Sequence, residues 1–170
     1  MKYTSAEAAK LLRSLNEAHA ALAEKEKKCE TFLVSVGEDI ESVRPEYDYR
    51  AVRAQLDELE EKIRRVKHAI NTFNLTHVVP GFDMTVDQML VYIPQLNVRK
   101  AKLTEMCSRL PKTRENNAYG RSNTIDYRYI NYELSATESD LKKVSDTLAR
   151  AQTALDVVNN SETLEIDVTL

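Results

Sequence analysis

Apolar residues recur every three or four positions along most of the chain, which is the spacing of an α-helix that packs along one face. The pattern is clearest over residues 49–73, where steps of three and four alternate without interruption: Tyr49, Val52, Leu56, Leu59, Ile63, Val66, Ile70 and Phe73. Charged residues fill the positions between them, as expected for the solvent-exposed side of a helix. The pattern predicts one helix about 37 Å long.

A first helix is predicted to begin directly after Thr4. Thr4 and Glu7 have the spacing of a capping box, in which each side chain accepts a hydrogen bond from the backbone N–H of the other residue. Apolar residues and one cysteine then recur at every seventh position: Ala8, Leu15, Leu22, Cys29 and Val36. We expect Gly37 to end this helix, because glycine readily adopts the left-handed conformation found at helix ends.

Two more helices are predicted in the second half of the chain. Thr85 and Gln88 form a second capping-box sequence, which predicts the start of a third helix, and Pro111 predicts its end. Apolar residues at spacings of three and four predict a fourth helix over residues 134–158. The chain is therefore expected to form four long helices.

Two segments alternate apolar and polar residues and are predicted to be short strands. They cover residues 124–130 and 163–170 and flank the fourth helix. Because an unpaired strand leaves its edge open, we expect the two strands to pair with each other or with copies in a neighbouring subunit. The predicted fold is mainly α: a single helical domain over residues 1–170, an elongated bundle or coiled-coil hairpins, with two short β-strands.

Composition limits the partners that the protein can have. The chain has 24 basic and 27 acidic residues and a net charge of -3, so no overall positive field attracts a nucleic acid polymer or an anionic membrane. It has no apolar signal segment and no run of 18 apolar residues, from which we expect a cytoplasmic protein. Cys29 and Cys107 are too few for a disulfide framework and fall on apolar helix faces, as core thiols do.

Sequence motifs for catalysis, metal binding and phosphate loops are missing. The chain contains neither GxxxxGK[ST] nor GxGxxG, and its three histidines, His19, His68 and His77, lie in separate segments. We therefore expect no metal, no cofactor and no enzymatic activity. A hydrolase would require His77 to converge with a nearby carboxylate.

One segment has a charge opposite to that of the whole chain. Between Pro111 and Tyr132 there are four basic and two acidic residues, a net charge of +2, and four of the eight tyrosines lie in this region. Arginine binds phosphate or carboxylate oxygens in pairs, and tyrosine rings stack on planar groups. The candidate ligand-binding residues are Arg114, Tyr119, Arg121, Ser122, Tyr127, Arg128 and Tyr129. Alternatively, the tyrosines form the buried face of a strand and the arginines pair with nearby glutamates.

The order of several short motifs resembles a known family. These motifs are INTFN at residues 70–74, MTVDQML at 84–90, YGRS at 119–122 and NSET at 160–163. They resemble the septicolysin-like family of small, largely uncharacterised bacterial helical proteins, over residues 48–163. The family label implies a lysin, but dense charge flanks every apolar stripe, so we expect no membrane lysis.

These observations favour a binding protein over an enzyme. We expect a non-enzymatic homo-oligomer that holds a small anionic ligand. A nucleotide-type signalling molecule is one candidate, and the protein would then act as a sponge that sequesters it. The alternative is a structural or adaptor coiled-coil protein without a small-molecule ligand, in which the tyrosine and arginine residues serve assembly. The two hypotheses differ in whether the oligomeric state depends on those residues.

Overall fold

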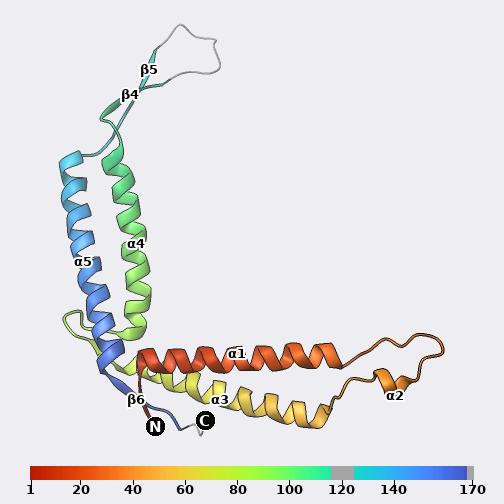
Figure 1. The fold of residues 1–170 in the computed structure, drawn as a ribbon. Helices are drawn as coiled ribbons and strands as arrows, with labels where there is room; N and C mark the ends of the chain where they lie inside the picture. The colour runs from red at the N-terminus through yellow and green to blue at the C-terminus, as the bar shows by residue number, and fades with distance from the viewer. Residues whose placement is uncertain (116–124, 168–170) are drawn as a thin grey trace. The chain divides into compact units, whose positions relative to one another are not determined.

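The structure is a computed structural model and describes residues 1–115 and 125–167. Over these residues the chain is mainly α-helical, with four long helices, one short helix and three two-stranded sheets (Figure 1). The predicted fold class is confirmed. The contacts divide the chain into two compact units, one formed by Met1–His77 with the segment from Val157 onward, and the other by Val78–Asp156.

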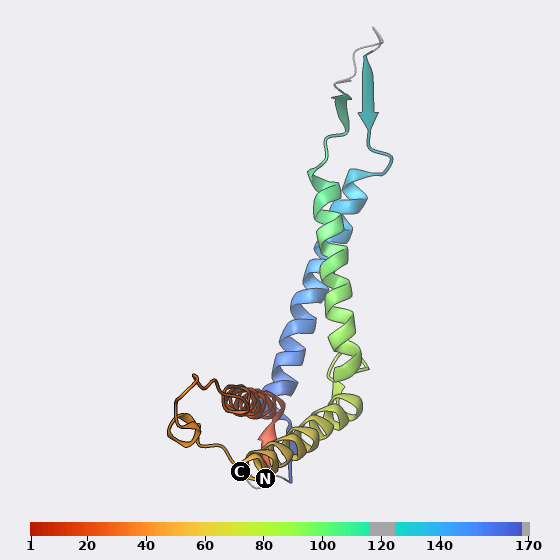
Figure 2. The same ribbon diagram turned by 90° about the vertical axis from the view of Figure 1, so that its right-hand side faces the viewer.

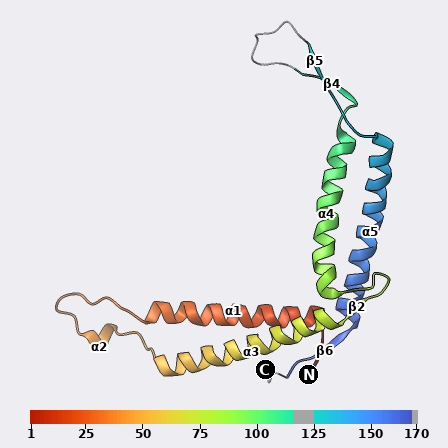
Figure 3. The same ribbon diagram turned by 180° about the vertical axis from the view of Figure 1, so that it is seen from behind.

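The first unit is a pair of long helices closed by a small sheet. Helices α1 (Ser5–Cys29) and α3 (Tyr49–Thr76) run antiparallel and lie side by side (Figures 1 and 3). The Thr4–Glu7 capping box predicted for α1 is present. Between the two helices, residues 30–48 form a connection that contains the short helix α2 (Ile40–Val43).

Helix α1 is shorter than the sequence predicts. It ends at Cys29, eight residues before Gly37, so the predicted helix end is wrong. Gly37 does have a positive φ of 96°, but it lies in a turn of the connecting segment. The seven-residue spacing reaches Val36, yet Val36 is fully exposed. Nothing within the described part of the chain covers Val36. A helix in water depends on packing for most of its stability, so the helix ends before this position.

Both predicted strands exist, but they do not pair with each other, which was one of the two pairings that the sequence left open. The first corresponds to β5 (Asp126–Tyr129), which pairs with β4 (Lys112–Glu115), a strand not predicted from the sequence. The second corresponds to β6 (Thr163–Glu165), which pairs with β1 (Lys2–Thr4). Each strand thus finds its partner within the same chain. The prediction for residues 168–170 lies outside the described residues.

The second unit contains the other two long helices. Helices α4 (Val86–Ser108) and α5 (Leu134–Ser161, up to Asp156 in this unit) run side by side, and α4 begins with the predicted Thr85–Gln88 capping box (Figure 1). A tight hairpin of β2 (Val78–Val79) and β3 (Met84–Thr85) precedes α4. Its turn contains Gly81 at a φ of 80°, a conformation that glycine adopts without steric cost.

Each unit buries apolar side chains of its own. In the first unit the most buried side chains from the helices and from β6 and its extension include Ala8, Leu56, Val66, Phe73, Leu164 and Ile166. In the second unit they include Val79, Val86, Met89, Leu96, Leu148 and Ala151. No buried polar side-chain atom lacks a hydrogen-bond partner within the described residues. Buried Thr137, which interrupts the apolar stripe of α5, donates to the backbone carbonyl of Leu134 at 2.7 Å.

Candidate functional site

The β4–β5 ribbon contains much of the segment that stands out in the sequence. Antiparallel pairing sets Lys112 opposite Tyr129 and Arg114 opposite Tyr127. Residues directly opposite each other in an antiparallel pair lie on one face, and alternate residues along a strand share it. One face of the ribbon therefore carries Lys112, Arg114, Tyr127 and Tyr129. We call it the cation–tyrosine face.

Side chains on the cation–tyrosine face are exposed, and Lys112 lies over both tyrosine rings. The ammonium nitrogen of Lys112 lies 4.0 Å from the ring centroid of Tyr127 and 5.4 Å from that of Tyr129. The two tyrosines are 46% and 61% exposed, respectively. A cation over an aromatic ring at an exposed site contributes about 0.5–1 kcal/mol. Lys112 thus brings the two rings together while much of their surface remains open to solvent.

The opposite face of the ribbon carries an ion pair. There Thr113 lies opposite Arg128, and Glu115 lies opposite Asp126. The guanidinium of Arg128 donates a hydrogen bond to the Glu115 carboxylate. Because the Arg128 side chain is 75% exposed, this pair contributes at most about 1 kcal/mol. An anionic ligand could therefore compete with Glu115 for Arg128.

A cavity of about 630 Å³ lies at the base of the ribbon. In this region β4 follows the end of α4 and β5 leads into the start of α5 (Figure 2). We call this space the hairpin-base cavity. It is lined by Arg109, Leu110, Thr113, Arg128, Tyr129, Ile130, Asn131 and Tyr132. Small-molecule sites commonly have volumes of about 300–1,000 Å³. Two guanidinium groups and two phenol rings thus border one space that is large enough for a small ligand.

Hydrogen bonds hold the walls of the hairpin-base cavity in place. The Tyr132 hydroxyl donates to the backbone carbonyl of Met106 at 2.7 Å, and the Ile130 N–H donates to the carbonyl of Pro111 at 3.3 Å. Arg109 donates to the Glu105 carboxylate one turn earlier in α4, and this hydrogen bond raises the pKa of Arg109 above its ordinary value. Arg109 therefore stays cationic throughout the physiological pH range.

The candidate residues from the sequence do not all lie together. Arg114, Tyr127 and Tyr129 lie on the cation–tyrosine face, whereas Arg128 lies on the opposite face. Tyr129 and Arg128 both line the hairpin-base cavity. Tyr127 and Tyr129 are exposed in this chain, so they do not form a buried strand face within it. The remaining candidates, Tyr119, Arg121 and Ser122, lie outside the described residues.

Three residues that contribute to this region are missing from the sequence-based set. Lys112 joins the cation–tyrosine face through strand β4, and Arg109 and Tyr132 line the hairpin-base cavity. The alternation of Lys112, Thr113 and Arg114 after Pro111 is the signal that could have revealed β4. Recognition of β4 would then have placed Lys112 and Arg114 beside the tyrosines of β5.

Other kinds of site have little support over residues 1–115 and 125–167. No three His, Cys, Asp or Glu side chains gather there in a way that could hold a metal ion. His77 stacks on Phe73 at a centroid distance of 3.9 Å, and His19 pairs with Glu60 at 3.4 Å. In the same part of the chain, none of the helices combines the length and apolar character needed to cross a membrane.

Comparison with known proteins relates the chain to one fold and to no established family. No protein-family model matches the chain, and no curated protein matches it. A similar solved structure is the crystal structure of a functionally unknown conserved protein from Corynebacterium diphtheriae. The two chains are 14% identical, the match covers 97% of this chain and 100% of the other, and the TM-score is 0.61. At this level of identity the likeness concerns the fold alone.

Proposed function

We propose that this chain is a non-enzymatic binding protein that holds a small, planar, anionic ligand, of which a nucleotide is the best example, in the hairpin-base cavity. The observation that carries the proposal is that Arg109, Arg128, Tyr129 and Tyr132 border a single cavity of about 630 Å³. Guanidinium groups bind phosphate oxygens with two hydrogen bonds each, and a phenol ring stacks on a planar base.

The adjoining cation–tyrosine face supports the same ligand class. Tyr129 belongs both to this face and to the cavity lining, so a ligand longer than the cavity would extend toward Lys112 and Arg114. A ribbon of two strands of four residues is marginally stable alone, because few side chains pack on it. A bound ligand that bridges both strands would stabilise the ribbon.

Sequestration is the biological role that agrees with binding without turnover. The proposal includes a homo-oligomeric, cytoplasmic protein that acts as a sponge for a signalling nucleotide. Membership of the septicolysin-like family, which the sequence motifs suggest, is part of the same proposal. Membership of that family implies no further activity here. Incubation with a bound nucleotide should return the nucleotide unchanged, and a hydrolysed product would contradict the non-enzymatic role.

Thermal-shift measurements with a panel of nucleotides test the ligand proposal. A nucleotide at one hundred times its dissociation constant should stabilise the protein by about 2.7 kcal/mol. Arg128→Ala and Arg109→Ala should each weaken binding at least about tenfold, because a hydrogen bond between two charged groups contributes roughly 1.5–3 kcal/mol. Binding should also weaken as salt is raised.

A matched control separates loss of the site from loss of any surface arginine. Arg53→Ala removes an exposed arginine that is paired with two carboxylates, where Arg128 is paired with one, and that does not line the cavity. It should leave nucleotide affinity unchanged. If no nucleotide raises the melting temperature, or if Arg53→Ala weakens binding as much as Arg128→Ala does, the ligand proposal is lost.

A structural or adaptor role is the second candidate, and exposed apolar side chains favour it. Leu33 and Val36, in the connection between α1 and α3, are fully exposed, and Tyr127 and Tyr129 are open to solvent. Such groups are typical of surfaces that another protein covers. Under this role no nucleotide binds, and Tyr127→Ala with Tyr129→Ala changes the sedimentation coefficient. Nucleotide binding together with unchanged sedimentation would favour the first candidate.

A further inference from the structure

Residues 30–48, which join α1 to α3, carry several large apolar side chains that the described part of the chain leaves partly or fully exposed. We call this connection the tip segment (Figure 3). Its large apolar side chains are 36% exposed or more: Phe32, Leu33, Val34, Val36, Ile40 and Val43. Isolated exposed apolar residues are common on proteins, but six within twelve consecutive positions are typical of an interaction surface. The tip segment therefore has the composition of a surface that binds an apolar partner.

The charge of the tip segment narrows the choice of that partner. It contains six acidic residues and one arginine, a net charge of 1 − 6 = -5. The arginine, Arg44, donates to Glu41 at 2.8 Å and lies over the ring of Phe32. Anionic lipid would be repelled by this charge, because like charges raise the free energy of association. A partner of the tip segment should therefore be both apolar and basic.

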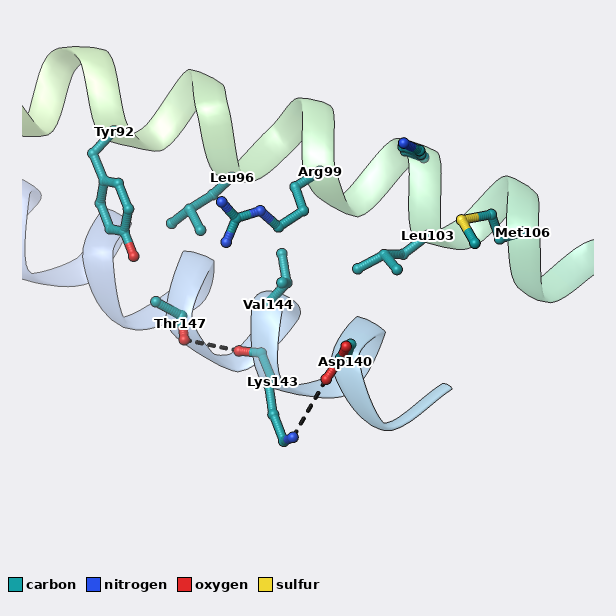
Figure 4. Close-up of a pocket in the computed structure, with 10 residues that line it drawn as sticks. Tyr92, Leu96, Arg99, Leu103, Met106, Asp140, Lys143, Val144 and Thr147 are labelled. Carbon is teal, nitrogen blue, oxygen red and sulfur yellow. Dashed lines mark hydrogen bonds and ion pairs between the residues drawn. The ribbon is translucent and has the colours of Figure 1, made fainter. Parts of the chain in front are cut away.

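A surface with that chemistry exists in the second unit of the chain. Helices α4 and α5 run side by side in that unit (Figure 1). A cavity of about 590 Å³ lies between them, and we call it the α4–α5 groove (Figure 4). Half-buried Leu103 and Met106 of α4 contribute accessible apolar side chains to its lining, above Leu96 and Val144, which are already almost fully buried.

Basic side chains surround this apolar lining. Arg99, Lys102 and Lys143 line the α4–α5 groove with a single acid, Asp140, a net charge of 3 − 1 = +2. Lys143 is paired with Asp140 at 3.3 Å, whereas Arg99 and Lys102 have no ion-pair partner among the described residues. Figure 4 shows Arg99 extending from α4 into the space between the helices. The groove thus presents at least two unneutralised cations beside an apolar surface.

We propose that the tip segment of one copy docks in the α4–α5 groove of a second copy of this chain. Both partners bury apolar side chains, and the net charge of -5 on one meets the net charge of +2 on the other. The hairpin-base cavity shares no lining residue with the groove, so this association does not require the proposed nucleotide.

Docking would also explain why the seven-residue repeat of apolar residues continues beyond the end of α1. The seven-residue spacing continues from Cys29 to Val36, beyond the end of the helix. Packing against a partner supplies most of the stability of a helix in a protein. Association should therefore extend α1 toward Gly37, and the helical circular-dichroism signal per residue should rise with protein concentration.

Sedimentation velocity of the full chain without nucleotide tests this proposal. Wild type should self-associate, more strongly at low salt than at high salt. A tip variant, Glu30→Lys with Glu38→Lys and Glu46→Lys, and a groove variant, Arg99→Glu with Lys102→Glu and Lys143→Glu, should each weaken association more than about tenfold. An equimolar mixture of the two variants should associate again, because the unchanged tip segment of the groove variant matches the unchanged groove of the tip variant.

A control variant carries the same change in charge as the groove variant, but at other sites. Lys10→Glu with Lys100→Glu and Lys142→Glu replaces three exposed lysines that line neither the groove nor the tip segment. It should associate as wild type does, and circular dichroism should show that every variant is folded. A monomeric wild type at all concentrations would overturn the proposal, as would a groove variant that associates normally or a mixture of the two variants that stays monomeric.

Replacement of apolar side chains provides a second, charge-independent variant. Leu33→Ser with Val36→Ser changes two fully exposed residues, so the fold should persist while association is lost. If wild type instead stays monomeric and floats with neutral phosphatidylcholine vesicles, and this variant does not, the occupant of the tip segment is lipid and the proposal fails.

Discussion

At the scale of single residues, charged neighbours set the electrostatics of the candidate site. Arg128 and Arg109 line the hairpin-base cavity, but each is paired with a glutamate, Glu115 or Glu105. An anionic ligand must replace these carboxylates as the partner of each guanidinium. The glutamates therefore lower the affinity of the site for anions and keep the arginines oriented.

Removal of one competing carboxylate should strengthen ligand binding. In Glu115→Gln the uncharged amide competes less strongly with the ligand for Arg128. The original Arg128–Glu115 ion pair is exposed and contributes at most about 1 kcal/mol, which limits the gain in ligand affinity. Nucleotide affinity should rise by up to about fivefold, as measured by calorimetric titration. Glu61→Gln, which affects an exposed pair with Arg65 in α3, should leave the affinity unchanged. A fall in affinity with Glu115→Gln would show that Glu115 itself contacts the ligand.

Tyr47 makes stability depend on alkaline pH. Its hydroxyl donates to the Glu26 carboxylate at 2.8 Å, and this hydrogen bond, with burial, raises the pKa of Tyr47 to about 12 from 10.0. Because the folded-state pKa is raised, the stabilisation is fully present below pH 10 and is lost as pH rises through 12. Denaturant unfolding of wild type and Tyr47→Phe should differ at neutral pH and converge near pH 12.

An absorbance titration of tyrosinate provides the direct check. Wild type should contain one tyrosine that ionises near pH 12 and that is absent from Tyr47→Phe. If the tyrosine missing from Tyr47→Phe instead ionises near pH 10 in wild type, the hydrogen bond to Glu26 does not form.

At the scale of elements, the sequence predicts the helices well and the sheet pairings poorly. Both capping boxes form as predicted, and α3 and α5 extend three residues beyond their predicted ends. These features depend on contacts between residues close in sequence. The β1–β6 pairing joins residues more than 150 positions apart, and a three-residue strand such as Lys2–Thr4 contains too few residues for a recognisable alternation.

Strand β6 contributes to the core through alternate residues. Leu164 is 7% exposed and lies opposite Tyr3, whereas Glu165 beside it is exposed. Leu164→Ala should lower the free energy of unfolding by roughly 2–4 kcal/mol, because the change removes a buried side chain. Glu165→Ala should change it by less than about 0.5 kcal/mol. Chemical denaturation measures both, and equal effects would contradict the assignment of Leu164 to the core.

At the scale of the whole molecule, helix α5 belongs to both compact units. It runs without a break from Leu134 to Ser161, with residues up to Asp156 in one unit and those from Val157 in the other. The sequence predicts a single domain. A continuous helix of this kind couples the stability of its two parts, because helix propagation is cooperative.

A single unfolding transition is therefore expected. Leu56→Ala in one unit and Leu148→Ala in the other, both nearly fully buried, should each lower the melting temperature of the same transition. The loss should be about 2–5 kcal/mol, which corresponds to roughly 2–4 °C per kcal/mol for a chain of this size. Leu75→Ala, at a 62% exposed position of α3, should have little effect. Calorimetry that resolves two transitions, each sensitive to one variant, would show two domains.

The sequence by itself determined where the long helices start, which of their faces are apolar, and that the net charge reverses between residues 111 and 132. These properties follow from local spacing and from composition. Tertiary structure decided which strands pair, that Arg114 and Arg128 lie on opposite faces of one ribbon, and that α1 stops at Cys29. The reason is that register and burial depend on contacts between residues distant in sequence, and a local pattern continues to favour a helix even where nothing packs against it.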